Sequence, residues 1–77
     1  MFNTHDKSII KNIVEKVFNK IENEKINKIS INKKNNELNV ILEDNNVEFP
    51  IKECSSLLYD GELIYIYKNK KFNLEIR

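Results

Sequence analysis

The hydrophobic pattern of this chain has two parts, a helical period at the start and an alternating period after it. That helical spacing puts the first apolar residues on one stripe of a helix, opposite a face of lysines and asparagines. Thr4 or Asp6 can cap the first turn, and the pattern ends near Asn23. The sequence predicts an amphipathic helix from about residue 6 to about residue 23. The residues of the apolar stripe are Ile9, Ile10, Ile13, Val14, Val17, Phe18 and Ile21.

Short runs of alternating apolar and polar residues follow the predicted helix, and each has the pattern of a half-buried strand. They lie at residues 29–31, 38–42, 47–51, 63–67 and 72–76. Pro50 lacks a backbone N–H, so the third strand is expected to be short or at an edge of the sheet. After the third strand we expect one helical turn that starts at Ser55 or Ser56, and a turn at Asp60-Gly61.

Turn-forming residues set the expected register of the strands. Asparagine tolerates the positive φ of tight turns, so Asn35-Asn36 is the expected turn of the first hairpin and Asn69-Lys70 the centre of the last. These turns put the apolar residues of each hairpin on one face, and a slip of one residue would reverse every side chain. The expected pairs are Ile31 with Val40, Ile29 with Leu42, Phe49 with Leu42, Ile51 with Val40, Tyr67 with Phe72, Tyr65 with Leu74, and Leu63 with Ile76.

The predicted fold is a single α+β domain of 77 residues, in which one N-terminal helix packs on a four- to five-stranded, mainly antiparallel sheet. A helix about 10–12 Å across cannot cover five strands, which span about 20 Å. We expect the sheet to curl toward a half-barrel around the helix, with residues 57–59 closing the end. The alternatives are a second copy or a foreign protein on the uncovered strands. The apolar residues expected on the covered face are Ile29, Ile31, Val40, Leu42, Phe49, Ile51, Leu63, Tyr65, Tyr67, Phe72, Leu74 and Ile76.

The amino-acid composition indicates what kind of protein this is and in which compartment we expect it. The chain is 40% hydrophobic and 32% charged, which is ordinary for a folded domain. Its single cysteine cannot form an internal disulfide, and no run has the length of a signal peptide core or the ~20 apolar residues of a membrane span. We therefore expect a cytoplasmic protein. The bias toward Lys, Asn and Ile is typical of A/T-rich genes, as in a low-GC bacterium, a phage or a mobile element.

No group of residues predicts catalysis, a metal site or a cofactor. His5 and Cys54 are the only conventional base and thiol nucleophile, and the sequence supplies no third group that would orient them. We interpret Cys54 as a buried or inert thiol. Gly61 is the only glycine, which excludes a phosphate-binding loop, and the nearby carboxylates of Asp60 and Glu62 lack the frame of a calcium loop.

Nucleic-acid binding is one alternative function. Lys33 and Lys34 lie at one predicted turn, and Lys68, Lys70 and Lys71 lie at another, beside the aromatic residues of the last hairpin. Lysines bind phosphates, and aromatic side chains stack on unpaired bases. The net charge of only +1 and the single arginine oppose this function. In a simple meander the two basic turns lie at opposite ends of the sheet, and they converge only if the segment 52–61 crosses over.

The predicted function is protein binding, as a small inhibitor or regulator that occupies a surface or basic groove of another protein, including a nucleic-acid-binding one. Residues 63–67 form an uncharged run of high β-propensity, flanked by Glu62 and Lys68 as gatekeepers. We expect a central, fully paired strand here, whereas an edge strand could accept a partner's strand. A homodimeric structural protein is a further alternative. The expected contact residues are Ile64, Ile66, Tyr65 and Tyr67, with Glu43, Asp44 and Glu48 as an acidic rim that attracts a basic partner.

Overall fold

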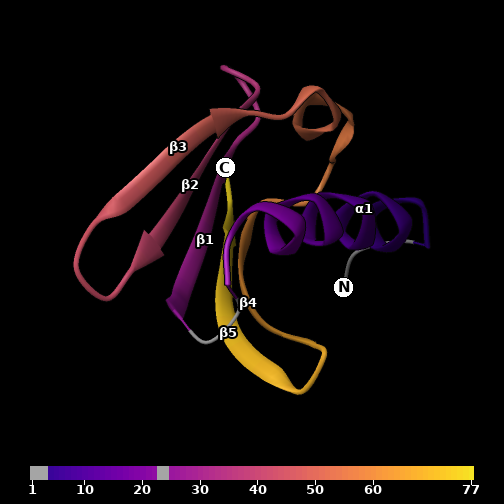
Figure 1. Ribbon diagram of the computed structural model, residues 1–77. Helices are drawn as coiled ribbons and strands as arrows, with labels where there is room; N and C mark the ends of the chain where they lie inside the picture. The colour runs from indigo at the N-terminus through magenta and orange to yellow at the C-terminus, as the bar shows by residue number, and fades with distance from the viewer. Residues whose placement is uncertain (1–3, 23–24) are drawn as a thin grey trace.

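The computed structural model describes residues 4–22 and 25–77, and it confirms the predicted α+β architecture. A helix, α1, lies across one face of a five-stranded sheet (Figure 1). None of the helices in the described ranges is long and apolar enough to cross a membrane. The elements are α1 (Thr4–Lys20), β1 (Ile26–Asn32), β2 (Glu37–Leu42), β3 (Asn46–Pro50), the short 3-10 helix η2 (Lys52–Ser56), β4 (Gly61–Tyr67) and β5 (Lys70–Ile76).

The apolar stripe of α1 packs on the sheet as the helical spacing predicts. Ile10, Ile13 and Val14 are fully buried, and Phe18 and Ile21 pack half-buried against the same core. Every residue assigned to the covered face of the sheet is either buried or packed against this core. The helix ends at Lys20, and its predicted end near Asn23 lies outside the described residues.

The strand order is β3-β2-β1-β5-β4, so the chain crosses over the sheet between β3 and β4. β1 and β5 are parallel neighbours, and the other neighbouring pairs are antiparallel. The sheet does not close into a barrel, and β3 and β4 form its two edges. The expectation that residues 63–67 form a central strand is therefore wrong, because among the described strands β4 pairs only with β5.

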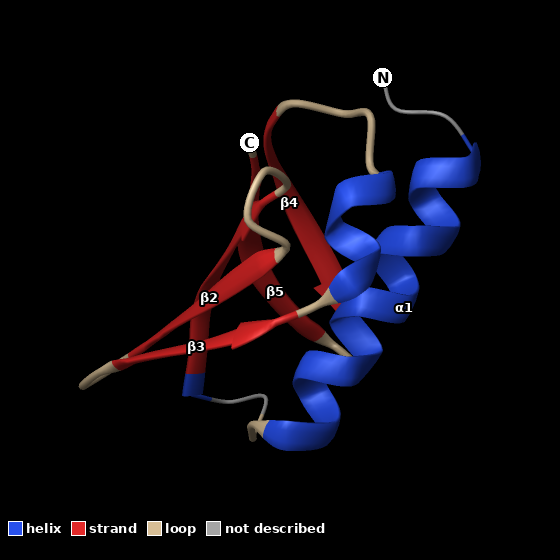
Figure 2. Cartoon of the chain, turned by 90° about the horizontal axis from the view of Figure 1, so that it is seen from above, coloured by secondary structure: helices blue, strands red, loops and turns tan. Residues whose placement is uncertain are grey.

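The segment between β3 and β4, which we call the crossover segment, covers the part of the sheet that α1 does not. η2 lies beside α1 on the same side of the sheet (Figure 2). Cys54 and Leu57 are buried beneath this segment and Tyr59 packs against the core, whereas Leu58 is exposed. The expected closure by residues 57–59 is thus wrong for Leu58 alone. The helical turn also differs from its predicted position, because it ends at Ser56 instead of starting there.

The strand registers differ from the predicted pairs by an even number of residues, so the faces are right and the partners are wrong. In the first hairpin Ile29 pairs with Val40. The Asn32 side chain explains this shift, since its Oδ1 accepts hydrogen bonds from the N–H groups of Lys34 (3.1 Å) and Asn35 (3.3 Å). Such an Asx turn closes a longer loop than the predicted tight turn.

The last hairpin turns at Lys68 and Asn69, with φ values of 49° and 65°. Two successive positive φ values are typical of a type I′ turn, whose twist matches that of the flanking strands. Tyr65 consequently faces Phe72 rather than Leu74. The other observed partners that replace predicted ones are Ile31 with Leu38, Phe49 with Leu38, Val47 with Val40, Leu63 with Leu74 and Gly61 with Ile76.

Hydrogen bonds to Asp6 link the crossover segment to the start of α1. Its side chain is buried, and its carboxylate accepts hydrogen bonds from the backbone N–H groups of Leu58 (3.2 and 3.3 Å) and Tyr59 (3.0 Å). The negative charge also lies in the first turn of α1, where the helix dipole favours it. A carboxylate expected as a local cap is therefore also a long-range link between the helix and the crossover.

Candidate functional site

Within the part of the chain that the structure describes, β4 presents a backbone edge that pairs with no other strand. In the type I′ turn the carbonyl of Tyr67 faces the N–H of Lys70, and from there alternate residues of β4 direct their N–H and C=O groups to β5. The residues between them, Glu62, Ile64 and Ile66, direct theirs away from the sheet. We call this row of outward backbone groups the free edge. Such a row is a template for pairing with another extended chain.

Two exposed isoleucines line the free edge. Ile64 is 59% exposed and Ile66 is 67% exposed, and both lie on the open face, the face of the sheet opposite α1. Their neighbours across β5, Asn73 and Lys71, are exposed as well. Full burial of an isoleucine contributes about 1.5–3 kcal/mol, so a partner that covers both would gain on the order of 2–4 kcal/mol.

Tyr65 and Tyr67 point to the opposite side, toward α1. The Phe18 ring meets the Tyr67 ring edge-on, with centroids 4.9 Å apart, and the Tyr65 ring lies 5.8 Å from that of Phe72. Burial, followed by the nearby Tyr67 and Glu15, raises the pKa of the Tyr65 hydroxyl. These rings extend the core out to the free edge. The four predicted hairpin contacts therefore share a strand but not a face.

The opposite edge of the sheet, β3, has features that discourage strand addition. It is a short strand that ends at Pro50 and carries the exposed Glu48. The Lys20 ammonium also lies 4.8 Å from the centroid of the Phe49 ring, on the other side of this strand. Proline, charge and short length all blunt a sheet edge. β4 is longer, and its stretch from Leu63 to Tyr67 is uncharged.

The acidic residues expected at the rim of the contact lie across the sheet from it. Glu43 and Asp44 belong to the turn between β2 and β3, and Glu48 belongs to β3. β2, β1 and β5 all stand between β3 and β4 in the strand order. The structure therefore does not place these carboxylates beside Ile64 and Ile66.

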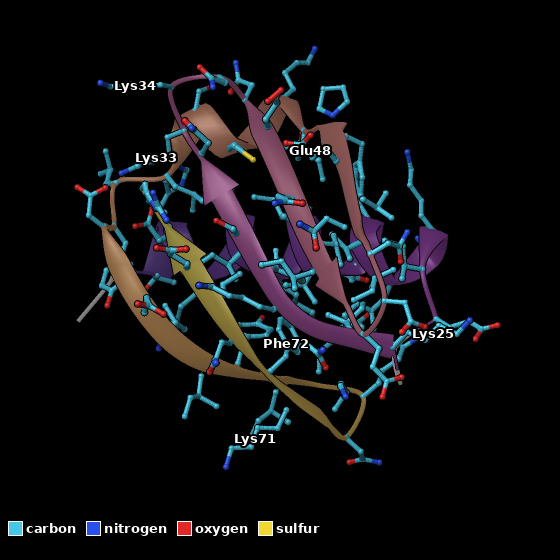
Figure 3. The ribbon with its side chains drawn as sticks, turned by 90° about the vertical axis from the view of Figure 1, so that its left-hand side faces the viewer. Lys25, Lys33, Lys34, Glu48, Lys71 and Phe72 are labelled. Atoms are coloured by element: carbon cyan, nitrogen blue, oxygen red, sulfur yellow. The ribbon has the colours of Figure 1, made fainter. Side chains whose placement is uncertain are left out.

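The basic residues of the nucleic-acid alternative also lie apart. Figure 3 shows the open face, with Lys33 and Lys34 at one end of the sheet and Lys71 at the other. The chain does cross over, but β1 and β5 run parallel, so the turn after β1 and the turn before β5 lie at opposite ends. Lys33 is also engaged locally, by the Asp60 carboxylate at 2.5 Å and the Tyr59 carbonyl at 3.1 Å.

A chain of ion pairs crosses the open face next to the free edge. The Lys28 ammonium lies 3.1 Å from the Glu75 carboxylate and 3.9 Å from that of Glu62, and Arg77 Nη2 lies 2.9 Å from Glu75. Ser30 Oγ donates a hydrogen bond to the same Glu75 carboxylate at 3.2 Å. The hydrogen bonds from Arg77 and then Lys28 favour the ionised form, and they lower the pKa of Glu75 to about 2.

The lowered pKa of Glu75 predicts a loss of stability in acid. Its ordinary pKa is 4.5, so the ionised carboxylate contributes fully above that value, and the contribution is lost as the pH falls toward about 2. We expect the melting temperature of wild type to exceed that of Glu75→Gln at neutral pH, and the difference to narrow steadily below about pH 5. Thermal denaturation across this pH range measures it. A difference that stays constant down to about pH 2 would contradict the assignment.

Cys54 and His5 occupy unrelated environments. Cys54 is buried in the core, and burial, with a smaller effect of the adjacent Glu53 charge, raises its pKa to about 11. His5 is exposed on the first turn of α1. The prediction of a buried thiol is confirmed. In residues 4–22 and 25–77, no three His, Cys, Asp or Glu side chains gather in a way that could hold a metal ion.

A shallow depression of about 490 Å³ adjoins the start of β4, lined by residues 60–62 and 75–77. Gly61 enters the strand with a φ of 138°, and a Cβ there would lie 3.1 Å from the Tyr59 hydroxyl. The only glycine of the chain therefore lets the crossover turn sharply into the free edge. The sequence predicted this turn. The charges of Glu62 and Lys68, which flank the uncharged run, are the sequence signal that the strand between them is exposed.

The fold and the free edge together define a small α+β domain with an open sheet. No protein-family model, no curated protein and no solved structure matches the chain.

Proposed function

We propose that this chain is a protein-binding module that acts without catalysis, by adding a partner's extended strand to the free edge of β4. The observation that carries the proposal is the coincidence of outward backbone groups and exposed side chains at Ile64 and Ile66. The backbone pairing supplies affinity, and alternate side chains of the added strand cover the isoleucines. A module of this kind sequesters a segment of another protein, which is the action of an inhibitor or regulator.

The free edge sets requirements on its partner strand. Leu63, Tyr65 and Tyr67 are half-buried on the side of α1, and Ile64 and Ile66 are exposed on the open face. An added strand must therefore carry apolar residues on both of its faces, which is unusual for a strand that is otherwise exposed to water. Such a segment is buried in its own protein, disordered until it binds, or itself an apolar strand at the edge of a sheet.

Ile64→Pro tests the backbone pairing without removing a bond of the sheet. The N–H of Ile64 points away from β5, so proline at this position deletes only a donor of the free edge. We expect at least a tenfold loss of partner binding, with a change in melting temperature of only a few degrees. Partners captured from a cell extract by immobilised wild type are compared with those captured by the variant, and hydrogen exchange of the complex locates the contact.

The matched controls separate the backbone from the side chains. Ile64→Ala keeps the N–H and should lose only the part of the binding due to the side chain. Ile66→Asp adds a charge on the free edge and should also prevent binding, whereas Asn46→Asp adds the same charge on β3 and should not. Binding that survives Ile64→Pro in a folded domain, with unprotected amides at positions 64 and 66, would exclude the free edge as the binding element.

A further inference from the structure

We infer that the strand that occupies the free edge is β4 of a second copy of this chain, which gives a symmetric homodimer with one continuous sheet. The inference rests on the proposed function and names the partner at that same site. Two identical edges related by a two-fold axis form an isologous contact, in which each contact occurs twice. Any such contact requires a strand that is complementary to itself when it runs antiparallel.

The direction of the backbone groups limits the possible registers. Hydrogen bonds form only where an outward residue of one copy faces an outward residue of the other. On β4 these are Glu62, Ile64 and Ile66, since Tyr65 and its alternates bond to β5. An antiparallel pair must therefore be centred on a residue between Glu62 and Lys68, and each register brings a different set of side chains together.

The register centred on Tyr65 is self-complementary on the open face. It places Ile64 opposite Ile66 of the second copy, and it places Glu62 at the level of Lys68, the turn residue that follows β4 of the second copy. Each of these contacts is repeated by the two-fold axis. The four exposed isoleucines of the two copies then form one apolar patch, and an ion pair closes it at each end.

The same register is also complementary on the side of α1. Tyr65 faces Tyr65 of the second copy, and Leu63 faces Tyr67, so half-buried apolar residues meet each other. The Lys68 ammonium lies 5.6 Å from the centroid of its own Tyr67 ring, on the side of α1. This exposed turn side chain must therefore change rotamer to pair with Glu62 of the second copy on the open face. Glu62 is exposed, and its contact with Lys28 is a loose one of 3.9 Å.

The neighbouring registers are poorer matches. Centred on Ile64, the pairing puts Glu62 against Ile66 of the second copy. Centred on Ile66, it puts Ile64 against Lys68. Both place a charged side chain opposite an isoleucine and break the pairing of Glu62 with Lys68, so each loses the apolar and the opposite-charge cross-strand pairs. The charge pattern of the edge therefore favours a second copy in one register.

The test is a charge reversal and its rescue in the 77-residue chain. Light scattering and sedimentation over a dilution series should show a reversible dimer for wild type. Glu62→Lys or Lys68→Glu puts two like-charge pairs into the contact and should weaken dimerisation about tenfold or more. The double variant restores both pairs with their signs exchanged and should recover the wild-type constant. Lys71→Glu on β5 and Glu48→Lys on β3 are the matched controls and should leave dimerisation unchanged.

A disulfide measures the register independently of stability. The Tyr65 residues of the two copies form a pair without hydrogen bonds, with Cα atoms about 4.5 Å apart, which suits a disulfide. In a Cys54→Ala background, Tyr65→Cys should form a covalent dimer under mild oxidation. Tyr67→Cys, which faces Leu63 of the second copy, should not.

The outcomes show separately whether the second copy is the wrong partner and whether the free edge is the wrong binding site. A chain that stays monomeric up to about 1 mM, or a dimer that ignores both charge reversals, overturns the second-copy inference. If that monomer still binds a foreign protein through contacts that Ile64→Pro abolishes, the proposed function stands and only the occupant is wrong. If neither a second copy nor a foreign protein protects the amides of Ile64 and Ile66, both proposals fail.

Discussion

Replacement of Ile13 by alanine is expected to lower the free energy of unfolding by about 2–5 kcal/mol. Ile13 is fully buried in the middle of the apolar stripe of α1. The truncation removes apolar contacts and leaves a cavity that a close-packed core fills only in part. A domain of 77 residues has a total stability of about 5–10 kcal/mol, so this single change removes a large share of it. Urea denaturation followed by circular dichroism measures the loss.

Ile66→Ala is the matched control for Ile13→Ala. It is the same chemical change, applied to a side chain that is 67% exposed on the open face. We expect a loss within about 0.5 kcal/mol in dilute solution, because most of this side chain already contacts water. Similar losses for the two variants would contradict the assignment of Ile13 to the core and Ile66 to a binding surface.

Replacement of Asp6 by alanine is expected to cost about 2–4 kcal/mol, although Asp6 is a charged residue near the start of the chain. Its side chain is 1% exposed, and its carboxylate accepts hydrogen bonds from the backbone N–H groups of Leu58 and Tyr59. Without the carboxylate, these donors lose a charge-assisted partner in a partly buried setting. The crossover that closes the core at Leu57 is then held less tightly. The unfolding midpoint in urea should fall with no change in slope.

Two further substitutions test the cause of this loss. Asp60→Ala removes the ion pair between Asp60 and Lys33. Because the Asp60 side chain is exposed, we expect this change to cost at most about 1 kcal/mol. Asp6→Asn keeps one acceptor oxygen without the charge, so its loss should lie between those of Asp60→Ala and Asp6→Ala. If Asp6→Ala is no more destabilising than Asp60→Ala, the carboxylate does not hold the crossover.

Periodicity was enough to assign side chains to faces, and turn chemistry decided partners that periodicity left open. Ile29 and Val40 were both placed on the covered face, which is correct, but the Asn32 side chain closes a longer loop and makes them partners. In the last hairpin, the two residues with positive φ are Lys68 and Asn69, so the two-residue turn lies one position earlier than expected. Both shifts are even, and an even shift keeps every side chain on its face.

The sequence singled out two residues of the candidate site, but it did not predict that their strand lies at an edge of the sheet. Ile64 and Ile66 stood out as apolar residues on a polar face, which any strand order would show. β4 is an edge strand because β5, and not β4, pairs with β1. The pairing of β1 with β5 is parallel. That pairing joins residues far apart in the chain, and no short-range pattern encodes it.

The sequence by itself determined the helix, the five strands, their buried faces and the single-domain α+β class. These follow from the repeat of side chains along a helix or a strand and from local turn residues, which act over a few positions. Only the tertiary structure decided the strand order, the link from Asp6 to the crossover and the exposure of β4. These depend on the packing of distant segments against each other, and that packing leaves one long apolar strand with an unpaired edge.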